Sequence, residues 1–349
     1  MHYTQTSLAR LNRASAYGTS LSLLLIIVVA NGVLTAIPAH PLDVAALTAG
    51  ADLIVVGEVT TVVEEGLTTL SLPGGSASAT LFKCSLRVDR VLKGELAAES
   101  LSFEFAVPRD LVGLGTVRLG QYGMFFLKTT DRDWEFFDAK HPALPAIWNA
   151  ARPTGIPLQD VTTALGKVLS SATSSDSDHA EALDALGRLN TDLAKAIMRE
   201  VLKNTSGELR LNIARTLVAH DDITGLQPVE TALSHADGLS QDMLANLAGS
   251  LSGLKDPRAI PVLAKLARSD SPNVRLNAAS ALRNTASSEA LAPLSELLSD
   301  ANPTIRYYAV AGLGEITRQN DWAPSFDEFS QHETRYLTYW RNWVQANLR

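Results

Sequence analysis

The sequence predicts a chain of two folded parts, a small β-barrel followed by an all-α superhelix, with an aromatic helix that covers the C-terminal end of the superhelix. Three observations support this prediction: an apolar pattern that recurs through the second half, a series of β-branched runs in the first half, and a dense group of aromatic residues near the end. The chain has 349 residues, of which 46% are hydrophobic and 19% charged. This composition is typical of a globular protein, and the length suits two domains.

The superhelix is predicted from five stretches that share one pattern, four positions at spacings of four, one and three residues. Successive stretches begin 31, 30, 35 and 31 residues apart, which is enough chain for two helices and two turns. Repeats of this length indicate stacked helix pairs, because each pair has an apolar face that only a neighbouring pair can bury. The stretches are Asp178/Ala182/Leu183/Leu186, Leu209/Ile213/Ala214/Leu217, Leu239/Met243/Leu244/Leu247, Val274/Ala278/Ala279/Leu282 and Ile305/Ala309/Val310/Leu313.

Two of these stretches carry the residues of a known repeat. VRLNAASAL from Val274 and IRYYAVAGL from Ile305 follow turns with an aspartate, and each is preceded by an apolar helix. This resembles the HEAT repeat, and the resemblance extends over about 156–317, which we take as the solenoid. In that family an arginine at the start of the second helix joins a ladder of side chains between repeats. The resemblance therefore implies a structural role for Arg210, Arg275 and Arg306.

The part that precedes the solenoid, residues 40–150, is predicted to be a β domain. A short helix is expected over 40–51, between Pro41 and Gly50. Runs rich in Val, Ile and Phe then predict about five strands separated by turn residues, which favours a small barrel over a sandwich. Pro73 and Gly74 mark a surface loop. The strands are expected over 51–65, 79–92, 100–106, 122–128 and 134–138, and the loop over 66–78.

The β domain also has a distant family likeness. The segments ADLIVVGEVTTV, LRVDRVLKGE and GQYGMFFLK look like a domain of exported bacterial proteins and are distantly similar to the OB-like barrel of netrin modules and tissue inhibitors of metalloproteinases. The likeness covers about 42–140 and implies an OB-like barrel. Those inhibitors act through an N-terminal cysteine, whereas the one cysteine here is Cys84, within a predicted strand. The barrel shape is therefore implied, but the inhibitory mechanism is not.

Residues 1–36 predict export. Arg10 and Arg13 precede an uncharged run, LSLLLIIVVANGVLTA, as in a signal peptide. The run is slightly shorter than the roughly 20 residues of a membrane-spanning helix, so an uncleaved N-terminal anchor is the alternative. In either case the body of the protein is expected outside the cytoplasm, periplasmic or extracellular.

The tail, residues 318–349, is rich in aromatic residues. The last repeat of a solenoid has no following neighbour, so an aromatic helix lying across it would bury the open face. We therefore expect a cap, the alternative being a ligand-binding aromatic patch. The aromatic residues assigned to the cap are Trp322, Tyr336, Trp340 and Trp343.

The sequence offers little for catalysis. The seven histidines include no pair at zinc-ligand spacing, and neither HExxH nor CxxC occurs, so neither a metal site nor a cofactor is predicted. The group His220-Asp221-Asp222 lies in a predicted turn, where capping explains it. The net charge is −7 with mixed signs, which disfavours nucleic acid as a partner. A membrane contact is expected only through the possible N-terminal anchor.

Two classes of function follow. The first is a non-enzymatic scaffold that binds a protein or peptide through the repeats, the barrel or both. The second is an enzyme or enzyme subunit resembling the HEAT-like lyases that attach bilins; a narrower idea is a protease-inhibitor-like module. On the second helix of each repeat, positions opposite the apolar stripe are expected to form the binding face, although packing between repeats would explain the apolar ones equally well. The expected partner-binding residues are Leu211, Arg215, Leu276, Arg283 and Tyr307.

Overall fold

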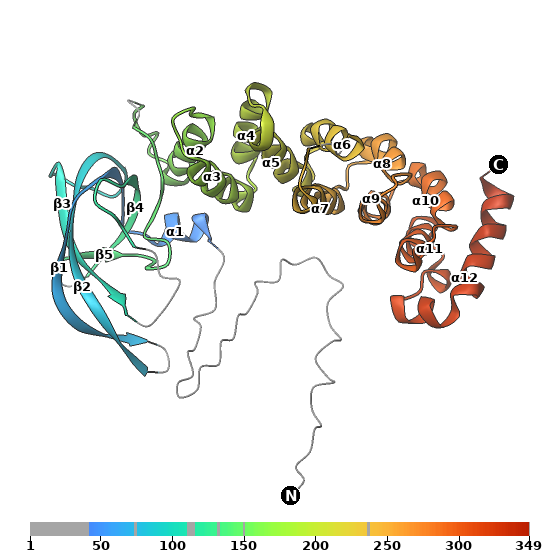
Figure 1. Ribbon diagram of the computed structural model, residues 1–349, viewed down its shortest axis with the longest axis horizontal. Coiled ribbons are helices and arrows are strands. Elements are labelled where there is room, and N and C mark those ends of the chain that lie inside the picture. Colours follow the sequence, from blue (N-terminus) through green and yellow to red (C-terminus); the bar gives the residue numbers. More distant parts are fainter. Residues whose placement is uncertain are drawn as a thin grey trace, which may run out of the picture.

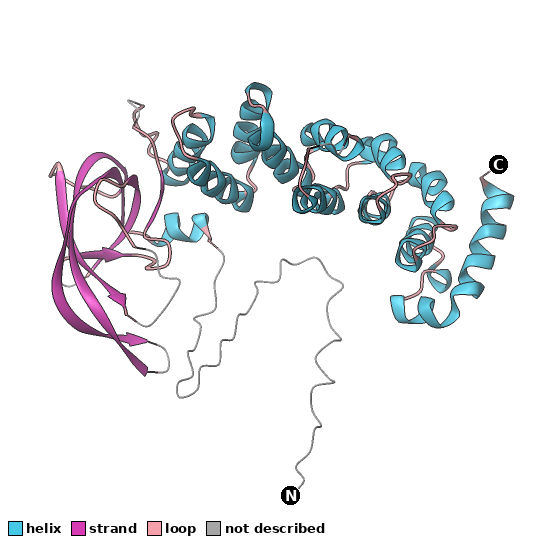
Figure 2. Cartoon of the chain, viewed as in Figure 1, coloured by secondary structure: helices cyan, strands magenta, loops and turns pink. Residues whose placement is uncertain are grey.

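The computed structural model shows a curved molecule with a β domain at one end and a long helix at the other (Figure 1). It describes residues 42–72, 75–109, 116–130, 133–148, 151–235 and 238–348. The predicted export segment, 1–36, lies outside these residues. Strands occupy the N-terminal end and helices the rest of the arc (Figure 2). No helix among the described residues is long and apolar enough to cross a membrane.

The β domain is a single antiparallel sheet that curls into a nearly closed barrel. Its strand order is β3-β2-β1-β4-β5, and β6 pairs with β4. The two ends of this order meet, because Phe136 of β5 lies edge-on to Phe103 of β3 with ring centroids 4.9 Å apart. This is the partly open, OB-like barrel that was expected. The strands are β1 (Leu53–Leu72), β2 (Gly75–Lys93), β3 (Ser100–Pro108), β4 (Tyr122–Thr129), β5 (Trp134–Phe136) and β6 (Ala143–Pro145).

Both faces of β4 and of the first part of β1, residues 53–59, are buried, which explains the nearly continuous apolar sequence of these segments. Alternate residues such as Leu53, Val55 and Phe125 point into the barrel. The residues between them, such as Ile54 and Phe126, belong to a second core that continues into the helices. Helix α1 (Val44–Gly50) lies in that second core, where it contacts both α2 and α3. The barrel is therefore joined to the solenoid by shared apolar packing.

The loop expected over 66–78 is wrong. The pairing of β1 with β2 continues outward to Leu72 and Gly75, so most of the expected loop lies within the two strands. Gly66 was interpreted as the start of the loop, but it lies at a register shift in β1 with φ of 135°. It is thus a bulge within the strand, where glycine tolerates the unusual backbone, and the threonines that follow favour continued pairing.

Cys84 lies inside the barrel and is fully buried. Burial raises the pKa of its thiol to about 11. The thiol is therefore protonated at neutral pH and unreactive, as expected for a cysteine that packs as a small apolar side chain.

Over the residues that the structure describes, the solenoid comprises five helix pairs. Each second helix begins close to the start of one of the five predicted stretches. Pro157, Pro272 and Pro303 stand in the first turn of their helices, where the missing N–H costs nothing. The helices are α2 (Pro157–Ser170), α3 (Asp176–Leu189), α4 (Asp192–Asn204), α5 (Gly207–Ala219), α6 (Leu226–Ser234), α7 (Gln241–Ser250), α8 (Ile260–Leu266), α9 (Pro272–Asn284), α10 (Leu291–Leu297) and α11 (Pro303–Thr317).

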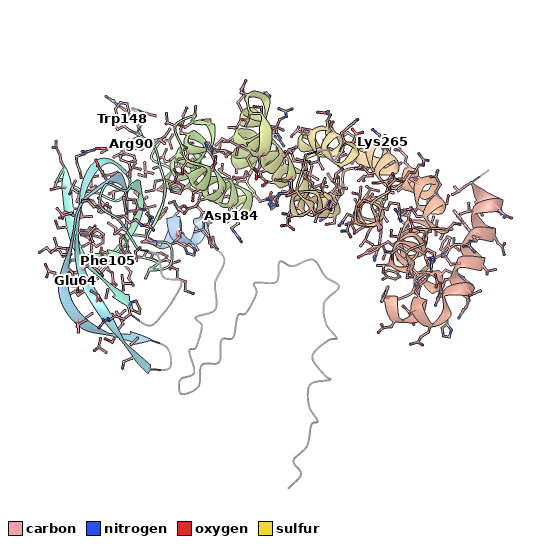
Figure 3. The ribbon with its side chains drawn as sticks, in the orientation of Figure 1. Glu64, Arg90, Phe105, Trp148, Asp184 and Lys265 are labelled. Carbon is pink, nitrogen blue, oxygen red and sulfur yellow. The ribbon has the colours of Figure 1, made fainter. Side chains whose placement is uncertain are left out.

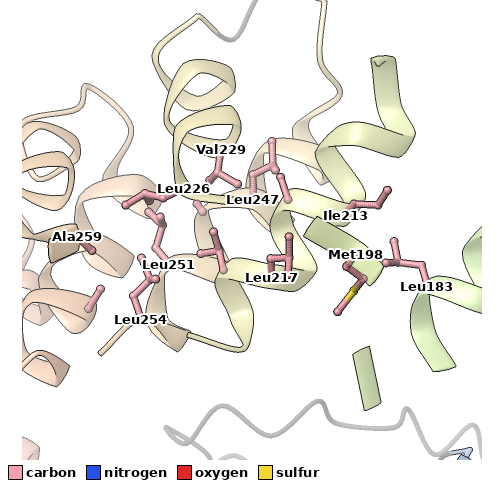
Figure 4. Close-up of a cluster of buried hydrophobic side chains, with 14 of the residues drawn as sticks. Leu183, Met198, Ile213, Leu217, Leu226, Val229, Leu247, Leu251, Leu254 and Ala259 are labelled. Atoms are coloured by element: carbon pink, nitrogen blue, oxygen red, sulfur yellow. The ribbon is translucent and has the colours of Figure 1, made fainter. Parts of the chain in front are cut away.

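The apolar stripes of neighbouring pairs merge into one continuous core (Figure 4). Leu183, Ile213, Leu217 and Leu247, all from second helices, lie in it beside Met198 of α4. Of the twenty positions in the five predicted stretches, fifteen are buried. Those that are only half-buried are Asp178, Leu209, Leu239, Met243 and Leu244.

The C-terminal helix α12 (Phe326–Asn347) covers the last repeat as an aromatic cap. Trp340 is fully buried, and its Nε1–H donates to the carbonyl oxygen of Trp322 at 2.9 Å. The ring of Trp322 stacks on Tyr339 with centroids 3.7 Å apart. Tyr336 is buried and Trp343 is half-buried against Trp340. The aromatic residues of the tail thus bury the open face of α10 and α11.

Candidate functional site

The candidate site is the concave side of the solenoid, which we call the inner face. It is formed by the second helix of every pair, namely α3, α5, α7, α9 and α11, whereas the first helices form the outer face (Figure 1). Asp184 of α3 lies on the inner side and Lys265 of α8 on the outer side (Figure 3). The β domain and α12 flank the inner face at its two ends (Figure 1).

The inner face contains a groove of about 850 Å³ between α3 and α5. This volume is within the range of ligand sites, but the groove is long and open instead of enclosed. It is lined by Asp176, His179, Ala180, Leu183, Asp184, Gly187, Arg188, Ser206, Glu208, Leu209, Asn212, Arg215, Thr216, Ala219 and His220. Such a mixture of apolar, amide and charged side chains suits a polypeptide.

Gly187 sets the depth of this groove at one end. A Cβ atom at this position would lie 2.8 Å from the Cγ2 atom of Thr216, closer than side chains normally approach. The absence of a side chain therefore allows α3 and α5 to come together where their C-terminal halves meet. Asp176 and Glu208 from the N-terminal turns line the groove as well, which is consistent with two helices that run in the same direction.

The charged side chains of the groove differ in whether they have an ion-pair partner. The guanidinium of Arg188 donates to the carboxylate of Asp184 at 2.7 Å, one turn away on α3. Arg215 and Glu208, both on α5, form no ion pair with any residue that the structure describes. These two charges of opposite sign are therefore available to a ligand.

His220 closes the C-terminal end of the groove. Its pKa is lowered, first by burial and then by the positive charge of Lys195. The ammonium of Lys195 donates to the His220 carbonyl oxygen at 2.8 Å. The imidazole is therefore neutral at neutral pH and can offer either a donor or an acceptor.

The predicted partner-binding residues fall into two groups. Arg215 lines the groove. Leu211, Leu276 and Tyr307 are half-buried and pack against the continuous core, while Arg283 pairs with Glu315 of α11 in a two-pronged ion pair. The hydrogen bonds to Glu315 raise the pKa of Arg283, so this cation already has a partner. Of these five residues, Arg215 alone carries a charge that has no ion-pair partner within the described chain.

The α11 end of the inner face is aromatic. Tyr307 lies edge-on to Phe326 with centroids 5.2 Å apart and also contacts Phe329, which is buried. The Phe326 side chain remains 44% exposed. An apolar or aromatic group of a ligand would find a partner here.

The three repeat arginines bind carbonyl oxygens at the end of the preceding helix or in the turn that follows it. Arg275 Nη1 donates to the carbonyl oxygens of Ser269 and Asp270 at 2.9 and 3.0 Å. Arg275 Nε also donates to Asp300 of the next repeat at 2.7 Å. Arg306 binds Glu333 of α12 in the corresponding way. Arg210 donates to the carbonyl oxygens of Leu202 and Thr205.

Replacing Arg275 by methionine is expected to lower the free energy of unfolding by about 2 kcal/mol, because a largely buried carboxylate loses its charged hydrogen-bond donor. Burial alone would raise the pKa of Asp300. The hydrogen bonds from the Arg275 side chain and from the backbone N–H of Asn302 lower it below 3.8. The stabilisation is therefore present above pH 3.8 and is lost as the pH falls through the lower pKa of the folded state. Urea unfolding at several pH values measures this.

The matched control is Arg268→Met, because Arg268 pairs with Glu296 on the surface, with both side chains at least half exposed. Exposed pairs contribute under about 1 kcal/mol. Equal losses in the two variants, or a loss at Arg275 that persists unchanged at pH 2, would contradict the role assigned to Arg275.

Sequence reasoning missed several residues of the groove, notably Glu208, Asn212 and Thr216. The sequence indicates only that consecutive second helices resemble one another. This resemblance does not show how closely α3 and α5 approach. Over the described residues, no cluster of three metal-binding side chains occurs. What the groove can do chemically is hold a ligand by hydrogen bonds and charge.

Solved structures with similar helical stacks are distant. An engineered protein is 21% identical over 47% of this chain and 82% of its own, with a TM-score of 0.33. A designed armadillo repeat protein in complex with a (KR)4 peptide is 19% identical over 46% of this chain and 83% of its own, with a TM-score of 0.33. No curated protein sequence matches the chain significantly.

The family comparison is more specific. Residues 229–314 match the family model for HEAT repeats. The match begins within α6 and ends within α11, so it covers the last three helix pairs. This part of the chain is therefore a HEAT-repeat solenoid, and α2 to α5 continue the same stack toward the barrel.

Proposed function

We propose that this protein is a non-enzymatic scaffold that binds an extended segment of another polypeptide along the inner face of its solenoid. The observation that carries this proposal is the open groove between α3 and α5, which lies on the same concave side of the solenoid as α7, α9 and α11. Solenoids of stacked helices generally use such concave surfaces for binding. The HEAT match supports the same class of function.

The dimensions of the inner face suit an extended chain. Neighbouring packed helices lie about 10 Å apart, so the four steps from α3 to α11 span roughly 40 Å. An extended polypeptide advances about 3.3 Å per residue, so roughly 12 residues would cross the whole face. The charged groove would hold one end of this segment and the aromatic end near Phe326 the other.

The test is to block the inner face without disturbing the fold. Gly249 of α7 is exposed, and a Cβ atom there would meet nothing within 4 Å. A tryptophan at Gly249 would cover the turn before it, toward the middle of the helix. Thr231→Trp provides the control, because Thr231 is exposed on α6 in the outer row.

The binding partner is first captured from the native envelope or secretome and identified, and its affinity for each purified variant is then measured by calorimetry. We expect Gly249→Trp to weaken binding at least about tenfold, a loss of 1.4 kcal/mol, and Thr231→Trp to bind like the unaltered protein. Equal affinities for the two variants would refute the inner face as the binding surface.

The proposal includes an exported location and a barrel distantly related to netrin-type modules. The first rests on the charged and apolar pattern of 1–36, and the second on the strand order of the β domain. Sequencing the N-terminus of the protein purified from its own cell tests export: cleavage near Ala30 supports it, and an intact N-terminus in the cytoplasmic fraction opposes it.

A further inference from the structure

Building on this proposed function, we infer that the groove between α3 and α5 selects a segment that carries a basic side chain and a carboxylate about three residues apart. The segment would lie along the two helices at this point, in an extended, polyproline-like conformation. The inference rests on the positions of the unpaired charges, the direction of the helices and the length of the groove.

The two ends of the groove differ in charge. Asp176 and Glu208 stand in the first turns of α3 and α5 and both line the groove at one end. Toward the other end stand Arg188 and Arg215, but Arg188 is neutralised by Asp184. The groove therefore presents a negative end and a positive position near Arg215, and complementary charges on a ligand would fix both its place and its direction.

The spacing of the charges limits the ligand. Glu208 and Arg215 are seven residues apart, which is two turns of α5 on one face and a rise of about 10 Å. A polyproline II segment advances about 3.1 Å per residue with three residues per turn, so its side chains recur on one face every 9 Å or so. A basic and an acidic side chain three residues apart would therefore face Glu208 and Arg215 together.

The middle of the groove suits the backbone of such a segment. Asn212 lies between the two charges on α5, and Thr216 follows Arg215; Leu183 and Ala180 of α3 line the same groove. A polyproline II backbone makes no internal hydrogen bonds, so its carbonyl and amide groups are free for polar side chains. The apolar side chains beside them would contact prolines or alanines of the ligand.

Four fluorescein-labelled peptides of about ten residues, rich in Pro and Ala, provide the probe. The first carries Lys followed by Glu three positions later, and the second carries the same residues in reverse order. The third has glutamine at both positions, and the fourth has Lys and Glu adjacent. Affinities are measured by fluorescence anisotropy at low and high salt, because these contacts weaken with ionic strength.

We expect one of the two three-residue orders to bind about tenfold more tightly than the glutamine peptide and than the adjacent-charge peptide. The charge-swapped variant Glu208→Arg/Arg215→Glu, with its fold checked by circular dichroism, should prefer the opposite order. Equal binding of all four peptides, no binding of any, or an unchanged preference in the swapped variant would overturn the inference. If Gly249→Trp weakens binding of the captured partner but the peptides give one of these contradicting results, the proposed function stands. Only the inferred selectivity of the groove is then wrong.

Discussion

Replacement of Leu282 by aspartate is expected to unfold the solenoid. Leu282 is fully buried on α9, which packs between α7 and α11 and against α8. Truncating a buried leucine alone costs about 2–5 kcal/mol, and burying a carboxylate without a partner adds several more. The total is comparable with the 5–15 kcal/mol that stabilises a typical domain. Loss of the cooperative transition in thermal unfolding, followed by circular dichroism, is the expected measurement.

The control places the same charge on the same helix. Asn273 is exposed near the start of α9, where a carboxylate is compatible with the helix dipole. We expect Asn273→Asp to melt within a few degrees of the unaltered protein. A normal melting curve for Leu282→Asp would mean that the repeat register is wrong.

Replacement of Trp340 by alanine is expected to detach the cap from the last repeat. Trp340 is fully buried and donates a hydrogen bond to Trp322. Emptying a buried tryptophan site costs about 3–5 kcal/mol. The variant should therefore unfold at a lower urea concentration and aggregate more readily, because the apolar faces of α10 and α11 become exposed. Truncation after Arg318 should have the same effect to a greater degree.

Asn342 provides the matched control, since it is exposed on the same helix. Asn342→Ala should leave the urea midpoint unchanged. If the protein truncated after Arg318 stays monomeric and equally stable but loses a partner, the aromatic residues form a binding site and the cap interpretation fails.

The helical part of the fold could be predicted because its determinants are local. Ala278, Ala279 and Leu282 are neighbours on one helical face, so their spacing in the sequence already states which side is buried. The same apolar spacing recurs in each repeat, and the repeats stack because each must cover the apolar side of its helices. The barrel strands could also be predicted, because Ile54 and Phe126 stand in runs that are too apolar for an exposed sheet.

The rest depended on contacts between distant residues. The short strand β6 was missed because Ala143–Pro145 gains its strand conformation only by pairing with β4. Tyr307 was predicted to bind a partner, yet it lies beside Phe326 and Phe329, which come from a helix that the repeat pattern does not describe. Its contribution to partner binding stays a prediction.

The candidate site was predictable only in outline. The second helices could be identified as binding elements, and Arg215 was among the residues expected there. That Arg215 and Glu208 would form no ion pair within the described chain, whereas Arg283 would pair with Glu315, depends on side-chain geometry across repeats. The close approach of Gly187 to Thr216 likewise joins two helices that the sequence treats as separate units.

Site-specific photo-cross-linking tests the central claim most directly. Asn212 on α5 and Asn277 on α9 occupy equivalent positions of their repeats, two helix steps or roughly 20 Å apart. A photoreactive phenylalanine analogue at each position, with Thr231 as the outer-face control, is cross-linked to the captured partner and the attachment points are found by mass spectrometry. We predict attachment to one segment of the partner at points about six residues apart, and none from Thr231. Attachment from Thr231 alone would contradict binding along the inner face.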